Sequence, residues 1–312
     1  MRVSIMAFMQ CPKCGFAAEL HALECVRCGV IFSKVTRADD FPILPRRESL
    51  EELDRVDDGR IGPREWKILG FGLVTAIAAY ALPFTRFVLS ALVTLFHEFG
   101  HAVAGWLMGY PSIPAFDFIY GGGLTHHGEF KPSIAIAIGI AFAYMMWLFR
   151  ENKKSVAIIG ALFLVWLFFI TREWRREIVF AGAGHAGELI LAGILFYKAL
   201  SGTGWRMPEI ERPLGAFIAF FVQIHTTMFA LRLLRDPEFF AWYRAGKGGA
   251  LMNDLEVIAL NIQIWTGLAP GIEGAAKGLL VFSVVPTLVA LAWYFERARW
   301  HRVLRALRTA ET

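Results

Sequence analysis

Charged residues are scarce in this chain. Asp, Glu, Lys and Arg make up 19% of the 312 residues, whereas 56% are hydrophobic and the mean hydropathy is +0.49. An average soluble domain contains about 25% charged residues. The composition therefore argues against an ordinary soluble protein and predicts a polytopic membrane protein. The net charge of +5 favours attraction to anionic lipid, and we expect no nucleic-acid binding.

Cysteine is absent after residue 28. The four cysteines form two C-x-x-C pairs, Cys11 with Cys14 and Cys25 with Cys28, each followed by glycine. This pattern is typical of a structural zinc ribbon, whose four thiolates leave the ion no open position for catalysis. We expect one structural zinc there, and reduced thiolates favour the cytosolic side of a membrane. Two disulfides or unliganded thiols are the alternative.

No amino-terminal signal peptide is evident, because the first apolar run starts only after about sixty mostly polar residues. Long apolar runs then follow, and we expect seven firm membrane spans and one span interrupted by polar residues. The firm spans cover residues 68–82, 84–108, 134–149, 156–170, 178–200, 214–231 and 279–295, and the interrupted span covers 251–268. The predicted fold is an all-α polytopic membrane protein of about seven or eight helices with a small zinc ribbon.

Basic residues beside the spans predict the orientation. With eight spans and a cytoplasmic amino terminus, most basic flanks lie inside, including Arg172, Arg232 and the tail from Arg297. Only the group that starts at Arg150 lies outside. We therefore expect a multi-pass protein of a bacterial cytoplasmic membrane with its amino terminus in the cytoplasm.

Residues 97–101 form an H-E-x-x-H motif inside an apolar run. On a helix, positions i and i+4 share a face, so His97 and His101 can reach one metal ion. Glu98 lies beside them, where it can act as general base and acid for a water molecule that zinc activates. Two helix histidines that bond to neighbouring helices are the alternative reading.

The chain resembles the site-2 protease family of intramembrane zinc metalloproteases. The resemblance covers roughly residues 66–295 and starts from the H-E-x-x-H motif. It continues in the glycine-rich segment 120–125, similar to a short extended element of that family, and in residues 248–255. It implies that Asp254 is the third ligand of a catalytic zinc and that Asn253 contacts substrate or supports the site. Many members have glycine after the aspartate, where this chain has Leu255.

A second pair of polar residues in an apolar run competes with Asp254 as source of the third ligand. His185 and Glu188 are three residues apart and can face one site. A satisfied polar pair at a tight helix crossing is the other explanation. We interpret His126 and His127 as surface residues and His225 as a core residue.

These observations predict four parts. They are a zinc ribbon at residues 1–36, a charged linker at 37–65, a transmembrane metalloprotease domain at 66–296 and a basic amphipathic tail at 297–312. We expect hydrolysis of membrane-anchored substrate proteins within the lipid bilayer, with a cytosolic protein partner for the ribbon. One alternative is a non-proteolytic zinc protein for transport, sensing or scaffolding. Another is a peptidase for prenylated or signal peptides that uses Glu188 as ligand.

Overall fold

The structure, a computed structural model, describes residues 8–11, 17–19, 23–25, 28–32, 61–117, 122–246 and 252–310. The chain divides into two compact units, Met1–Asp58 and Gly59–Thr312. Cys14 and most of the predicted linker at 37–65 lie outside the described residues.

The first unit contains a small antiparallel hairpin. Strands β1 (Phe8–Gln10) and β2 (Ala17–Glu19) pair with Phe8 opposite Glu19. Further on, the amide of Cys25 donates to the carbonyl of Val30, and Gly29 at φ +68° donates back to the carbonyl of Cys25. A positive φ costs little only for glycine, so the glycine after Cys28 permits a tight turn at this point.

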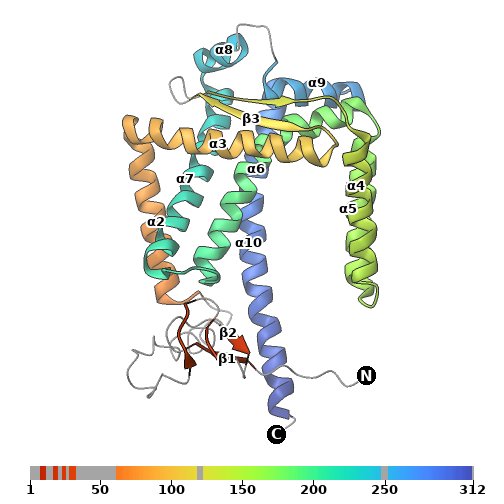
Figure 1. The fold of residues 1–312 in the computed structure, drawn as a ribbon. Coiled ribbons are helices and arrows are strands. Elements are labelled where there is room, and N and C mark those ends of the chain that lie inside the picture. Colours follow the sequence, from red (N-terminus) through yellow and green to blue (C-terminus); the bar gives the residue numbers. More distant parts are fainter. Residues whose placement is uncertain are drawn as a thin grey trace. The chain divides into compact units, whose positions relative to one another are not determined.

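The second unit is mostly helical (Figure 1). Its helices are α2 (Pro63–Ala81), α3 (Pro83–Leu107), α4 (Pro132–Leu148), α5 (Lys153–Ile170), α6 (Glu173–Ser201), α7 (Pro208–Arg235), α8 (Pro237–Ala245), α9 (Asp254–Thr266) and α10 (Gly271–Ala310). Several begin with proline, which is well tolerated there because the first helical N–H has no partner in the helix. Strands β3 (Ser112–Asp117) and β4 (Gly122–His127) form an antiparallel hairpin between α3 and α4.

Five of the described helices are long and apolar enough to cross a membrane, namely α3, α5, α6, α7 and residues 271–297 of α10. They are typical of a multi-pass membrane protein. The predicted count of seven or eight spans is not confirmed. The 17 residues of α4 fall just short of span length, and α9 has only 13, about 20 Å against a hydrocarbon core of about 30 Å. Helix α2 carries Arg64, Glu65 and Lys67 in its first turns.

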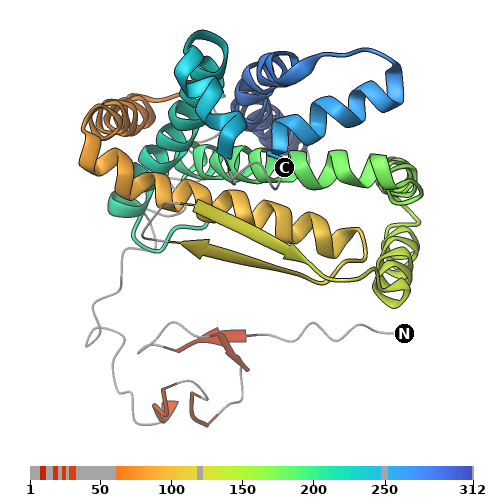
Figure 2. The same cartoon turned by 90° about the horizontal axis from the view of Figure 1, so that it is seen from above.

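Glycine allows a close approach of two helices in this unit. Helices α3 and α6 lie side by side (Figure 2), and a Cβ atom added to Gly187 would stand 2.7 Å from the Cα atom of Gly100. Small residues let helix backbones meet in this way within a membrane. Helix α3 also runs across the directions of α2, α7 and α10 (Figure 1).

Two other segments differ from this packed centre. Helices α4 and α5, both described in full, contain no buried residue and stand to one side of the bundle (Figure 1). The predicted tail at 297–312 is not separate from the last span, because α10 continues without interruption to Ala310.

Candidate metal centre

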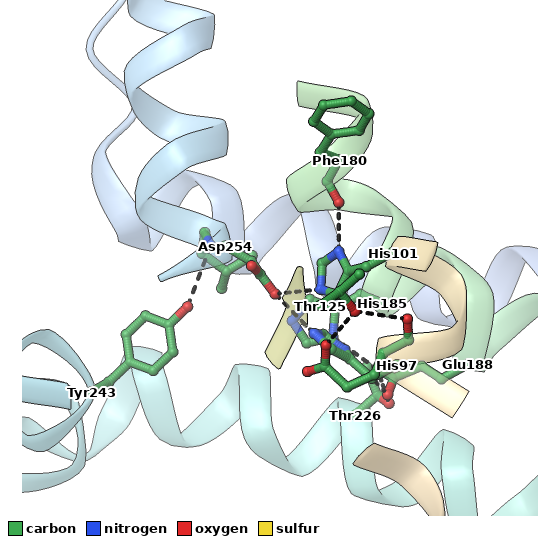
Figure 3. Close-up of polar contacts among 11 residues, drawn as sticks. His97, His101, Thr125, Phe180, His185, Glu188, Thr226, Tyr243 and Asp254 are labelled. Carbon is green, nitrogen blue, oxygen red and sulfur yellow. Dashed lines mark hydrogen bonds and ion pairs between the residues drawn. The ribbon is translucent and has the colours of Figure 1, made fainter. Parts of the chain in front are cut away.

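The two histidines of the motif converge on Asp254. The Nε2 atom of His97 lies 2.8 Å from Oδ2 of Asp254, and Nε2 of His101 lies 3.3 Å from the same oxygen (Figure 3). Helix α3 supplies both imidazoles from one face, as the spacing predicts. Three atoms of the types that bind zinc therefore meet at one point, from helices far apart in the sequence.

Asp254 is held at the first residue of α9. Asn253 stands at the N-cap, its backbone amide donates to the Glu256 carboxylate at 2.9 Å, and its side-chain amide donates to the carbonyl of Tyr243 at 2.5 Å. The Tyr243 hydroxyl in turn accepts from the amide of Leu255 at 3.3 Å. Asn253 therefore supports the turn that presents Asp254.

Asp254 has the charge that metal binding requires. Burial alone would raise the pKa of its carboxyl group, but hydrogen bonds from His101 and His97 outweigh burial and hold this pKa well below its usual value. The helix N-terminus also favours a negative charge. Metal binding requires an ionised carboxylate, and an ion would replace the protons through which the two histidines bond to Asp254.

The separation of His101 Nε2 from Asp254 Oδ2 fits a shared zinc ion, whereas His97 Nε2 lies at hydrogen-bond distance from the same oxygen. Zinc bonds to His and carboxylate ligands are about 2.0–2.2 Å long, so two ligand atoms in a tetrahedral site lie about 3.3 Å apart. Gly184 of α6 faces the same point, because a Cβ atom there would lie 2.5 Å from Nε2 of His101 and in collision with Nε2 of His97. The space next to both nitrogens is therefore free because residue 184 has no side chain.

Glu98 belongs to α3, and its side chain faces strand β4 of the β hairpin. Its side chain is buried, and the hydroxyl of Thr125 on β4 lies 2.7 Å from Oε2, to which it can donate. Gly123, also on β4, stands so close that a Cβ atom there would come within 2.5 Å of Oε1. Strand β4 therefore both holds the predicted general base and leaves room for it, a role for Thr125 that the sequence did not indicate.

His185 and Glu188 lie beside the centre on α6. Nδ1 of His185 is 2.8 Å from Oε1 of Glu188, and the Thr226 hydroxyl donates to that oxygen at 2.9 Å. Oε2 of Glu188 is 3.7 Å from Nδ1 of His97. The rival pair thus faces the ring nitrogen that points away from Asp254. His97, His185 and Glu188 nevertheless form a second group whose atoms are close enough to share an ion.

A cavity of about 680 Å³ opens beside these side chains. Its lining includes the metal-centre residues, strand β4 from Gly122, and residues of α8 and α9. This volume is typical of a ligand site.

Three further histidines have different surroundings. His126 is exposed, as predicted, but His127 lines the cavity, stacks on Phe180 and lies 2.7 Å from the Ser112 hydroxyl. Burial lowers the pKa of His127, as do His101 and His126, so this ring is neutral at pH 7. His225 also lines the cavity, although its Nδ1 atom is buried.

The amino-terminal unit contains a separate candidate site. The sulfur atoms of Cys11, Cys25 and Cys28 lie within 4.8 Å of one another, and those of Cys11 and Cys28 are 3.6 Å apart. This distance is far longer than a disulfide bond and close to the roughly 3.8 Å between thiolates of a tetrahedral zinc site. The predicted fourth ligand, Cys14, lies outside the described residues.

Comparison with known proteins gives no relative: no protein-family model matches the chain, and neither curated proteins nor solved structures contain a match. The function must therefore be inferred from the side chains themselves.

Proposed function

We propose that this protein is an intramembrane zinc metalloprotease. The observation that carries the proposal is the convergence of His97, His101 and Asp254 on one point, with Glu98 beside them. A purely structural site has no need for a carboxylate placed next to the two histidines. The long apolar helices of the same unit support a bilayer as the place of reaction.

Each residue of the site has a defined task in peptide hydrolysis. A bound zinc would polarise the scissile carbonyl group and make water more acidic. Glu98 takes the proton as the water oxygen bonds to the carbonyl carbon, and returns it to the amide nitrogen as the C–N bond breaks. Thr125 holds the carboxylate during both transfers. The products are one carboxylic acid and one amine.

The β hairpin supports an extended substrate. In the described part of the chain β3 and β4 pair only with each other, and β4 lines the cavity. A substrate helix must unwind before its carbonyl groups become accessible, and an exposed strand edge can hold the unwound segment through backbone hydrogen bonds. Membrane-anchored proteins with a single span are the substrates we propose.

The amino-terminal unit has a different task. A zinc ion bound by Cys11, Cys14, Cys25 and Cys28 would have no open position, so this unit stabilises and docks and does not catalyse. We propose that it faces the cytoplasm of a bacterial cell, where it binds a protein partner.

A zinc transporter or sensor is the second candidate. It is favoured by the two adjacent groups that share His97, one with Glu98 and His101 and the other with His185 and Glu188. Two neighbouring binding positions would allow a zinc ion to move from one to the next during transport.

Zinc content and cleavage together test the proposal. The full chain would be purified in detergent and compared with His97→Ala/His101→Ala, Asp254→Ala, Cys25→Ser/Cys28→Ser and Glu98→Gln. We expect two zinc ions in the wild type and one in each of the first three variants. Glu98→Gln should keep both ions but lose cleavage of a reconstituted single-span peptide.

Either of two results would contradict the protease. If the Cys25→Ser/Cys28→Ser variant contained no zinc, the membrane unit would not bind zinc. Alternatively, Glu98→Gln could leave every measured activity unchanged while zinc stays bound, and the transporter would then be the better explanation.

A further inference from the structure

Glu188 is a buried carboxylate for which the proposed chemistry gives no task. It lies in the middle of α6, one of the long apolar helices, and is 3% exposed. An ionisable group in such a position is costly unless other groups satisfy it, and it indicates a function by default.

Both oxygen atoms of Glu188 face polar partners. Oε1 lies within hydrogen-bond distance of His185 Nδ1 and accepts from Thr226 on α7. Oε2 faces Nδ1 of His97 at 3.7 Å. An ionised carboxylate only accepts hydrogen bonds, so the Nδ1 atoms of His185 and His97 that face Glu188 are placed to donate to it.

In each histidine of the motif, the two ring nitrogens face different partners. In His101, Nε2 faces Asp254 while Nδ1 lies 2.6 Å from the carbonyl oxygen of Phe180 on α6. In His97, Nε2 faces Asp254 while Nδ1 faces Glu188, also on α6. A histidine that binds metal commonly donates its other N–H to a carboxylate or a carbonyl group, which fixes its tautomer and orientation.

We propose that Glu188 is a positioning residue, which holds His97 with Nδ1 protonated and Nε2 presented to the metal, and that Thr226 and His185 hold Glu188 in turn. The inference rests on the metal site of the proposed function. It assigns Glu188 to the support of His97 and not to the ion that Asp254 would hold, because Oε2 of Glu188 faces Nδ1 of His97 whereas Asp254 faces Nε2. Helix α6 thus orients both histidines of α3, one through a side chain and one through its backbone.

Metal affinity tests this role without any need for activity. Zinc affinity of the full-length protein, measured by competition with a chromophoric chelator, should fall about 10- to 100-fold in Glu188→Gln. Glu188→Asp keeps the charge and should recover part of the loss. Thr226→Val removes one brace while it keeps the packing, so a smaller loss is expected. Glu173→Gln, an exposed carboxylate on the same helix, is the control and should match the wild type.

The visible spectrum of the cobalt-substituted protein separates positioning from ligation. If Glu188 only positions His97, Glu188→Gln should keep an intense four-coordinate spectrum with shifted bands. Loss of that spectrum at saturating cobalt would show that Glu188 is a ligand and overturn the inference. Unchanged affinity in Glu188→Gln would also overturn it, and unchanged affinity in Thr226→Val would decide against it if Glu188→Gln does not fold.

The inference and the proposed function can fail separately. If the wild-type protein binds no metal in its membrane unit, both the proposed function and the positioning role of Glu188 are wrong. A wild type that binds zinc and cleaves peptide, together with a Glu188→Gln variant of unchanged affinity, ends only the positioning role.

Discussion

The α3–α6 crossing and the α4–α5 hairpin are both apolar and both contain glycine, yet they use it differently. At the crossing, Gly100, Gly184 and Gly187 stand against backbone or metal-centre atoms of the other helix. In the hairpin, a Cβ atom at Gly139 would meet no described atom within 4 Å, and one at Gly160 would only touch Met146 at 3.9 Å. The comparison teaches that glycine is required here where a reactive centre lies between two helices, and is optional where helices face their surroundings.

Gly184→Ala should have the largest effect. The new methyl group would compete with the ion for the space next to both Nε2 atoms, so zinc content should fall to that of His97→Ala/His101→Ala and cleavage should disappear. Elemental analysis of the purified protein measures this. Gly182→Ala, on the same helix with no described atom near its Cβ position, should retain zinc. Full zinc in Gly184→Ala would remove the role assigned to this glycine.

Gly123→Ala should separate catalysis from metal binding. A methyl group there collides with the Glu98 carboxylate, and a displaced general base should lower kcat by about 100-fold, with zinc content unchanged. Single-turnover cleavage and metal analysis on the same sample check both parts. The neighbouring Gly122→Ala meets no described atom within 4 Å and should retain wild-type kcat. Equal rates for the two variants would contradict the placement of Glu98.

Gly100→Ala should reduce stability. Its Cβ atom would overlap the carbonyl oxygen of Ala183 on α6, and such overpacking costs typically about 1–3 kcal/mol. The midpoint of thermal unfolding in detergent should fall accordingly. An unchanged midpoint would mean that α3 and α6 can separate at little cost.

Gly139→Ala in α4 should have the smallest effect. With open space around it, alanine is expected to leave stability unchanged or to raise it by up to about 1 kcal/mol, because alanine is the better helix former. The same thermal measurement tests this, and a clear loss of stability would reveal that α4 packs closely against something at this position.

The sequence predicts the local parts of the site better than its assembly. His97, Glu98 and His101 could be identified because the period of a helix alone brings them to one face. Asp254 required the resemblance to a known family, since no local pattern connects it with residues 157 positions earlier. Glu188 was recognised as important, but whether it faces Nδ1 or Nε2 of His97 depends on the way α6 packs, which no spacing encodes. Thr125 and Thr226 gave no signal because threonine is common in strands and helices alike.

Hydropathy predicts more spans than the described helices confirm, for a related reason. The run at 251–268 is apolar enough to count, but the helix in it starts only at Asp254 and ends at Thr266. The N-cap at Asn253 and the left-handed Gly267 fix these ends. An apolar run shows that a segment avoids water, whereas the length of its helix is decided by the residues that stop it.

Metal binding by Asp254 would also restrict the unfolded chain. A metal held by His97, His101 and Asp254 would join residues 157 positions apart and so close a loop through half of the protein. In theory, cross-links that close long loops restrict the unfolded chain most. Loss of the ion would then do more than stop the chemistry, because it would also open this loop and lower the stability of the folded chain.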